Sequence, residues 1–255
     1  MQHTLIVETH PGDAVHRRTH RRSPRERDLL WTQRGFADDV GENGGDDAVS
    51  AYHRDRLQDS RRGGVLESLA VLILASSSPR RAELLAAAGI PFEVVPVDVD
   101  ESVVRLEPPG DHVRRLAREK ATAAFAGYPD RVVLGADTIV LVGGEMMGKP
   151  RDEADAVRML RLLSGREHEV LTGLAILSKR TTVVEVARTR VWFNPMHEGE
   201  IVEYVASGEP LDKAGAYGIQ GRGAKFIDRI QGSYSNVVGL PVALVYRLLK
   251  GYPEK

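Results

Sequence analysis

The sequence predicts a mixed α/β domain over residues 69–255, preceded by an extension over residues 1–68. Two observations support this prediction. From Val71 onward, apolar runs of strand length alternate with apolar patterns of helical period. Several strand-like runs also follow one another with no helix between them, so we expect a mixed sheet rather than a purely parallel one.

The extension differs in composition from the rest of the chain. Residues 1–68 hold eleven arginines, no lysine and five of the eight histidines. A basic run over residues 16–28 precedes an acidic, glycine-rich run over residues 37–47, and apolar periodicity is almost absent, which is typical of disorder. A nucleic-acid arm or a regulatory tail is the alternative. The acidic run offsets the basic one, so we favour a solvated extension and expect no nucleic-acid partner.

Composition also excludes several classes of protein. The chain has no cysteine, which rules out disulfides and thiolate metal sites. No apolar run reaches the length of a membrane span, and the first residues lack the apolar core of a signal peptide. We therefore expect a cytoplasmic protein with no membrane partner.

The first elements are a strand, a helix, a second strand and a long helix. Residues 71–76 form an apolar strand, after which Ser78 and Pro79 are typical of a helix start and Gly89 of a helix end. Alternation predicts a strand over residues 92–100. The long helix over residues 111–128 places four residues near one face: Val113, Leu116, Lys120 and Ala124.

The later elements follow from the same periodicities. Glycines, which break strands and end helices, separate most of them. They are a hairpin over residues 131–150 broken at Gly143-Gly144, a capped helix over 152–165, a strand pair over 168–179 and 181–194, a short helix over 197–208, a glycine-punctuated strand and loop over 217–233, and a closing helix over 234–251.

The junction between the first strand and helix is a candidate phosphate site. The first turn of a helix presents unpaired N–H groups and the positive end of a dipole. The serines over residues 76–78 add hydroxyl donors, and Arg80 and Arg81 add guanidinium groups suited to phosphate oxygens. An ordinary capped helix is the alternative, but a cap requires one serine. Lys120, on an apolar helix face, and Lys149, after the hairpin, are further candidate cations.

A carboxylate in an apolar strand is the second candidate. Asp137 lies within "VLGADTIV", where a buried carboxylate is costly unless it is paired or binds a metal. It is therefore a candidate Mg²⁺ ligand or general base, although it could instead cap a turn after Gly135. Glu101 is a candidate for a second carboxylate, and Asp98 and Asp100 compete with it.

Two glycine-rich stretches differ in meaning. Residues 143–150 match the start of a phosphate-binding P-loop, but Pro150 stands where Ser or Thr is required, so we reject an ATPase site. Residues 208–227 combine closely spaced glycines with Lys213 and Gln220. Gln220 can both donate and accept, which suits a pyrimidine edge, whereas a structural loop is the alternative.

Seven short motifs stand in order between residues 71 and 250: "LASSSPRRAELL", "LAREKA", "GADTIV", "GKP", "LTG", "GEPLDKAGAYGIQG" and "GSYSNVVGLP". Together they resemble the Maf family of nucleoside triphosphate pyrophosphatases. The chain looks like the branch that hydrolyses dTTP and UTP, because that branch carries the residues found here as Arg80, Thr138 and Gln220. The branch associated with 7-methyl-GTP typically has tryptophan in place of Arg80.

The resemblance implies a two-lobed fold around a long twisted mixed sheet, with flanking helices, a central cleft and often a homodimer. It also implies hydrolysis of pyrimidine nucleoside triphosphates to monophosphate and pyrophosphate, with Mg²⁺, or alternatively Mn²⁺. A nucleotide-binding regulator of cell division without essential catalysis is the alternative. The implied roles are Asp137 as catalytic base, Arg80, Thr138 and Gln220 for base specificity, Ser76, Ser78, Arg81, Lys120 and Lys149 for phosphate, and Glu101 and Asp137 for the metal.

Overall fold

The computed structural model describes residues 71–250. The predicted extension over residues 1–68 lies outside the described residues, as does the boundary proposed at residue 69. No helix within residues 71–250 has the length and apolar character needed to cross a membrane.

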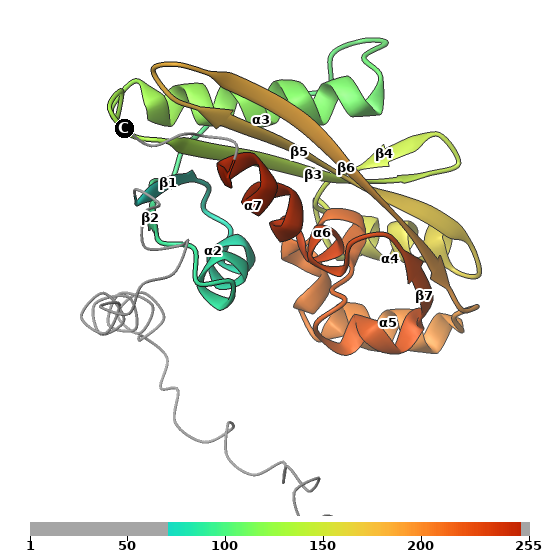
Figure 1. Ribbon diagram of the computed structural model, residues 1–255. Helices are drawn as coiled ribbons and strands as arrows, with labels where there is room; N and C mark the ends of the chain where they lie inside the picture. Colours follow the sequence, from blue (N-terminus) through green and yellow to red (C-terminus); the bar gives the residue numbers. More distant parts are fainter. Residues whose placement is uncertain (1–70, 251–255) are drawn as a thin grey trace, which may run out of the picture. The chain divides into compact units, whose positions relative to one another are not determined.

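The described residues form a mixed sheet, as predicted (Figure 1). Its strand order is β2-β1-β3-β5-β6-β7, with β4 paired to the end of β3. The pairs β1/β2 and β1/β3 are parallel, and the other pairs are antiparallel. The strands are β1 (Leu72–Ala75), β2 (Phe92–Val94), β3 (Val133–Val142), β4 (Glu145–Met147), β5 (Glu167–Leu177), β6 (Thr182–Phe193) and β7 (Ile227–Gln231).

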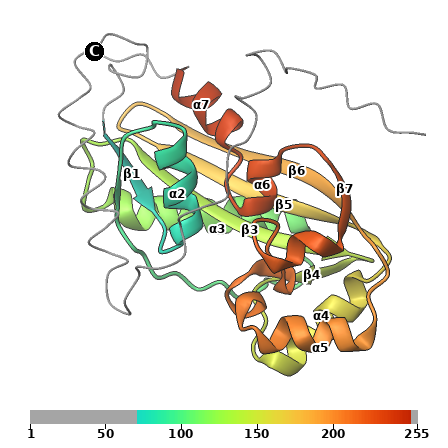
Figure 2. The ribbon, with the colours of Figure 1, turned by 90° about the horizontal axis from the view of Figure 1, so that it is seen from below.

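Helices cover both faces of this sheet (Figures 1 and 2). The long helix α3 lies on one face, and α2, α6 and α7 lie on the other, while α4 and α5 lie near β4 and β7. The helices are α2 (Pro79–Ala87), α3 (Pro109–Phe125), α4 (Glu153–Leu163), α5 (Glu198–Ala206), α6 (Tyr234–Val238) and α7 (Val242–Lys250), with short 3₁₀ turns at η2 (Glu209–Asp212), η3 (Ala214–Ala216) and η4 (Arg222–Phe226).

The alternation of β1 divides its side chains between two apolar layers. Leu72 and Leu74 pack with residues of α2 and α7, whereas Ile73 and Ala75 pack with alanines of α3. Because successive side chains of a strand point to opposite faces, a fully apolar strand is the expected sequence for a sheet covered on both sides.

Two glycines allow α3 to lie very close to the sheet. A Cβ atom at Gly135 of β3 would come within 2.2 Å of the Ala117 carbonyl oxygen, and one at Gly173 of β5 within 2.0 Å of the Val113 carbonyl oxygen. Any larger residue would push α3 away from the strands. This close packing fixes the helix that carries Lys120 relative to the strand that carries Asp137.

A separate apolar cluster forms a second lobe. The distal parts of β3, β5 and β6 pack there against β4, α4 and α5, around residues such as Met147, Leu160 and Phe193. The clusters on the two faces near β1 form the first lobe. The predicted mixed α/β fold with two lobes is therefore confirmed.

Two predicted elements differ from the structure. The strand expected over residues 92–100 ends at Val94, because only Phe92–Val94 pairs with β1. The residues that follow carry Glu101 towards the site. The closing helix is divided into α6 and α7 at Gly239, whose φ of 128° is outside the helical range.

Candidate active site

A cavity of about 770 Å³ contains nearly all the residues singled out from the sequence. Both lobes contribute to its walls, as expected for a central cleft. The predicted residues that line it are Ser76, Ser78, Arg80, Arg81, Glu101, Lys120, Asp137, Thr138, Lys149 and Gln220.

Arg81 holds one wall of the cavity together. Its side chain is only 8% exposed, and it donates to the carbonyl oxygens of Gly239 (3.0 Å) and Ala136 (2.8 Å). It also donates to Ser76 Oγ and to Thr138 Oγ1, each at 3.1 Å. Burial lowers the pKa of Arg81, and the nearby carboxylate of Asp137 opposes that shift. Arg81 therefore joins β1, β3 and the residues after α6.

The serines at the start of α2 differ in what they contact. Ser76 Oγ accepts from the backbone N–H of Ser78 (3.2 Å) as well as from Arg81. Ser78 occupies the predicted N-cap position, with Pro79 following it, but its side chain makes no capping hydrogen bond. The Ser78 hydroxyl thus lines the cavity without a capping role, which leaves it available to a ligand.

Thr138 is bound to the same wall. Besides accepting from Arg81, its hydroxyl lies 3.0 Å from Thr172 Oγ1 and donates to the Gly239 carbonyl at 3.4 Å. The hydroxyl predicted to contact a base is therefore already part of a hydrogen-bonded group. The structure places Thr138 in the cavity wall, next to Asp137.

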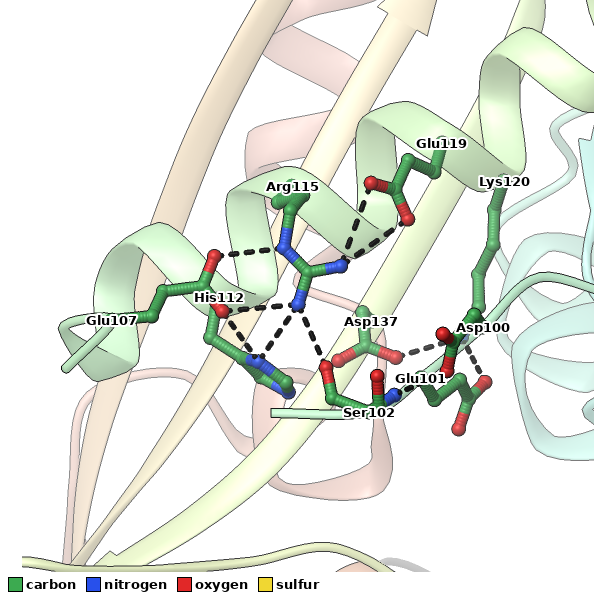
Figure 3. Close-up of polar contacts among 9 residues, drawn as sticks. All are labelled: Asp100, Glu101, Ser102, Glu107, His112, Arg115, Glu119, Lys120 and Asp137. Carbon is green, nitrogen blue, oxygen red and sulfur yellow. Dashed lines mark hydrogen bonds and ion pairs between the residues drawn. The ribbon is translucent and has the colours of Figure 1, made fainter. Parts of the chain in front are cut away.

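Lys120 brings two carboxylates together (Figure 3). Its Nζ lies 2.7 Å from Asp137 Oδ1 and 2.6 Å from Glu101 Oε1. Asp137 and Lys120 are only 6% and 8% exposed, whereas Glu101 reaches them from an exposed segment. Within residues 71–250, Asp137 Oδ2 has no hydrogen-bond partner. One oxygen of a buried carboxylate is thus free beside the cavity.

The structure shows which of the three acidic residues after β2, Asp98, Asp100 or Glu101, lies opposite Asp137. Asp100 Oδ1 accepts from the backbone N–H of Ser102 (2.9 Å), which lowers the pKa of Asp100. Asp98 is exposed and does not line the cavity. Glu101 is therefore the residue of the three that faces Asp137.

Arg80 is held by a residue that the sequence patterns did not single out. It donates to Asp212 Oδ2 (2.7 Å) and to the Asp212 carbonyl oxygen (3.0 Å). Lys213 Nζ donates to Asp212 Oδ1 at 2.7 Å. Burial raises the pKa of Asp212, but the hydrogen bonds from Lys213 and Arg80 outweigh it, so the net shift is downward. The sequence did offer one signal for this contact, because Asp212 is an acidic residue next to Lys213 within a glycine-rich stretch.

Glu209 orders the glycine-rich segment over residues 208–223. Its Oε2 accepts from the backbone N–H of Arg222 (2.9 Å), and its Oε1 accepts from the Tyr204 hydroxyl (2.8 Å). The Tyr204 hydroxyl in turn accepts from the backbone N–H of Gly218 (3.0 Å). Sequence reasoning missed both residues, because their partners lie on separate turns of the chain. The result is a folded wall that carries Gln220.

Two predicted ligand-binding side chains remain unpaired. Lys149, after β4, is exposed at the cavity and forms no ion pair with the residues that the structure describes. Gln220 is likewise exposed and makes no side-chain hydrogen bond within residues 71–250. Both are free to meet a ligand, whereas Arg80, Arg81 and Lys120 already have protein partners.

Comparison with known proteins identifies the family. Residues 71–252, most of the chain, match the family described as Maf-like protein. The chain belongs to the Maf family. The resemblance predicted from the motifs is therefore confirmed.

Individual proteins that are similar to this chain match it over almost their whole length. A dTTP/UTP pyrophosphatase of Citrifermentans bemidjiense is 54% identical over 181 residues, which are 70% of this chain and 94% of that protein. A dTTP/UTP pyrophosphatase of Bacillus mycoides is 54% identical over 181 residues, 71% of this chain and 95% of that protein. The Ham1 protein of Staphylococcus aureus, a solved structure, has a TM-score of 0.45 at 17% identity, covering 71% of this chain and 99% of that one.

Proposed function

We propose that this Maf protein hydrolyses dTTP and UTP to the monophosphate and pyrophosphate. The observation that carries the proposal is the buried carboxylate of Asp137, with one free oxygen, in a cavity that also presents cations and a helix start. That combination suits attack of water on a phosphoanhydride bond. The relatives described as dTTP/UTP pyrophosphatases support the choice of substrate.

The donor set fits a magnesium ion that arrives with the nucleotide. Glu101 and Asp137 would hold it, because their carboxylates already converge on a single cation, the ammonium of Lys120. Within residues 71–250, no group of three or more His, Cys, Asp or Glu side chains forms a metal cage. Magnesium commonly takes one or two carboxylates and completes its shell with phosphate oxygens and water. When bound, it stabilises charge on the phosphate oxygens and acidifies the attacking water.

The protein's own groups supply the remaining chemistry. Asp137 Oδ2, which is unpaired, accepts the proton of the water that attacks the α-phosphorus. Lys149, the Ser78 hydroxyl and the start of α2 bind triphosphate oxygens, while the ion pair with Lys120 orients the Asp137 carboxylate. Arg81 contributes through Ser76 and Thr138, which it fixes in the wall.

The same site would read the base through Arg80, Thr138 and Gln220. Uracil and thymine present two carbonyl acceptors on either side of one N–H donor. The free amide of Gln220 can accept from that N–H and donate to one carbonyl, and Arg80 can donate to the other. Cytosine leaves a mismatched pair, which costs about 1–3 kcal/mol.

A cytoplasmic location and a homodimer complete the proposal, both on the strength of the family resemblance. Sedimentation velocity tests the second. A nucleotide-binding regulator of cell division would have no use for a carboxylate with a free oxygen beside the cavity, so we favour catalysis.

A panel of nucleoside triphosphates with Mg²⁺ tests the function, with pyrophosphate and orthophosphate measured separately. We expect pyrophosphate release that is faster with dTTP and UTP than with purine triphosphates. Gln220→Glu should reduce turnover of dTTP and UTP without loss of folding, and Arg80→Trp should shift the preference away from them. Equal rates with GTP or ATP would show that the base-reading scheme is wrong, and release of orthophosphate alone would contradict the reaction.

A further inference from the structure

Glu101 belongs to a segment that has little packing of its own. The segment between Val94 and Pro109 contains no helix or strand. Val103, Val104 and Leu106 are 59%, 51% and 91% exposed. Leu106 also adopts a φ of 66°, which is costly for a residue other than glycine. Val95 and Val97, which precede Glu101, pack against the apolar layer of β1 and α3, but the residues after Glu101 add no comparable apolar burial.

Arg115 of α3 binds this segment at two residues that follow Glu101 in the sequence, Ser102 and Glu107 (Figure 3). Its Nη2 donates to the carbonyl oxygen of Ser102, the residue after Glu101, at 3.0 Å. Its Nε and Nη2 donate to the two carboxylate oxygens of Glu107, at 2.8 and 3.0 Å. This bidentate pair has a more specific geometry than a single ion pair.

The partners of Arg115 are themselves fixed. Glu107 Oε2 lies 3.0 Å from His112 Nδ1, and the hydrogen bonds from Arg115 lower the pKa of Glu107 to about 2. Glu119 contacts Arg115 Nη1 at 3.3 Å from the next turn of the helix. Glu107 is mostly buried, with 11% of its side chain exposed, so its pairing with Arg115 is less screened by solvent than a surface pair.

Helix α3 links the contacts of Arg115 to the proposed reaction centre. Arg115 and Lys120 lie on the same helix, whose buried residues pack closely against β3, the strand of Asp137. A group held by Arg115 is therefore held at a fixed place relative to Lys120 and Asp137. Arg115 itself does not contact these two residues or Glu101.

We propose that Arg115 is a positioning residue for catalysis, which places the Glu101 carboxylate opposite Asp137 by binding the Ser102 carbonyl and the Glu107 carboxylate. The inference rests on the proposed role of Glu101 in the pyrophosphatase reaction. It assigns a role in catalysis to a residue outside the cavity, since Arg115 is not among the residues that line it.

A double-mutant cycle tests the coupling. Arg115→Gln should lower kcat/KM for dTTP by about ten- to a hundredfold. In a Glu101→Gln background, the same change should cost less than about twofold, because the residue that it positions has already been removed. Glu107→Gln should show the same dependence on Glu101. Arg114→Gln is the matched control, since within the described part of the chain Arg114 pairs only with Asp111, on the exposed side of α3, and the change should leave kcat/KM unchanged.

Limited proteolysis gives a readout that does not require activity. Arg105 is exposed within the segment, so trypsin can cut after it. Arg115→Gln and Glu107→Gln should accelerate this cut several-fold, measured by mass spectrometry, while Arg114→Gln should not. Unchanged cleavage in both variants, or equal activity losses with and without Glu101, would overturn the proposal. If the wild type releases no pyrophosphate, the proposed function fails, and the proteolysis alone decides whether Arg115 anchors the segment.

Discussion

The two walls of the cavity are held by different kinds of contact. On one wall, Arg81 is buried and bonds to main-chain and hydroxyl oxygens of β1, β3 and the turn after α6. On the other, the segment over residues 208–223 is held by two of its own carboxylates, those of Glu209 and Asp212. The first wall is bonded to main-chain and hydroxyl oxygens of buried strands. The second depends on side-chain pairs, and these lie closer to solvent.

The largest expected effect comes from Asp137, the buried carboxylate that lines the cavity. Asp137→Asn should lower kcat by about 10²- to 10⁴-fold, because an amide cannot accept the proton of the attacking water. The measurement is pyrophosphate release, with the thermal transition as a check on folding. Asp98→Asn is the control, since Asp98 is exposed and outside the cavity. Retention of most turnover would remove Asp137 as the base.

The second prediction compares the neighbouring arginines directly. Arg81→Lys should lower the free energy of unfolding by about 3 kcal/mol, because lysine cannot satisfy the four oxygens that Arg81 contacts. Arg80→Lys should cost under about 1 kcal/mol, since its pair with Asp212 is partly exposed. Urea denaturation of both variants measures the difference. Equal losses would mean that the two walls are not held differently.

The third prediction concerns the aromatic support of the second wall. His168 is buried, with Nε2 2.8 Å from the Tyr217 hydroxyl and with its ring edge-on to Phe193 and Tyr217. Burial lowers the pKa of His168 from 6.5 to about 4. The unfolded chain therefore binds a proton at a higher pH than the folded one, and stability is lost as the pH falls from 6.5 towards 4.

By pH 4 this histidine should lower the free energy of unfolding by on the order of 3 kcal/mol, because its pKa is 6.5 in the unfolded chain and about 4 in the folded one. His168→Gln should flatten the fall in unfolding free energy between pH 6.5 and 4.5, a range above that in which Glu107 titrates. Chemical denaturation at a series of pH values provides the comparison. An unchanged slope in His168→Gln would assign the loss to other groups.

The smallest effect is expected where the two walls meet. Asp212→Asn should weaken the hold on Arg80 and reduce the preference for dTTP over GTP by about two- to fivefold, the range expected of a partly exposed pair. The ratio of kcat/KM values for the two nucleotides measures it. Asp111→Asn, which removes a similarly exposed pair with Arg114, should leave the ratio unchanged. A ratio that is unaffected by Asp212→Asn would separate base selection from the position of Arg80.

The sequence by itself determined the order and type of most elements. The apolar period of β1 and of α3, the glycine break between β3 and β4, and the serine–proline start of α2 are local signals that the structure confirms. It also singled out many of the residues that line the cavity, among them Arg80, Asp137 and Gln220, but not Glu209 or Asp212.

Tertiary structure alone decided how those residues divide between holding the site and facing a ligand. Asp137 and Lys120 meet only because α3 lies on β3, and Glu101 is selected over Asp98 and Asp100 by a chain segment whose path no periodicity specifies. In the same way, Asp212 pairs with Arg80, while Lys149 lines the cavity without an ion pair to any residue in the range 71–250. Charges pair through space, and residues far apart in the sequence become neighbours only when the sheet and its helices have packed.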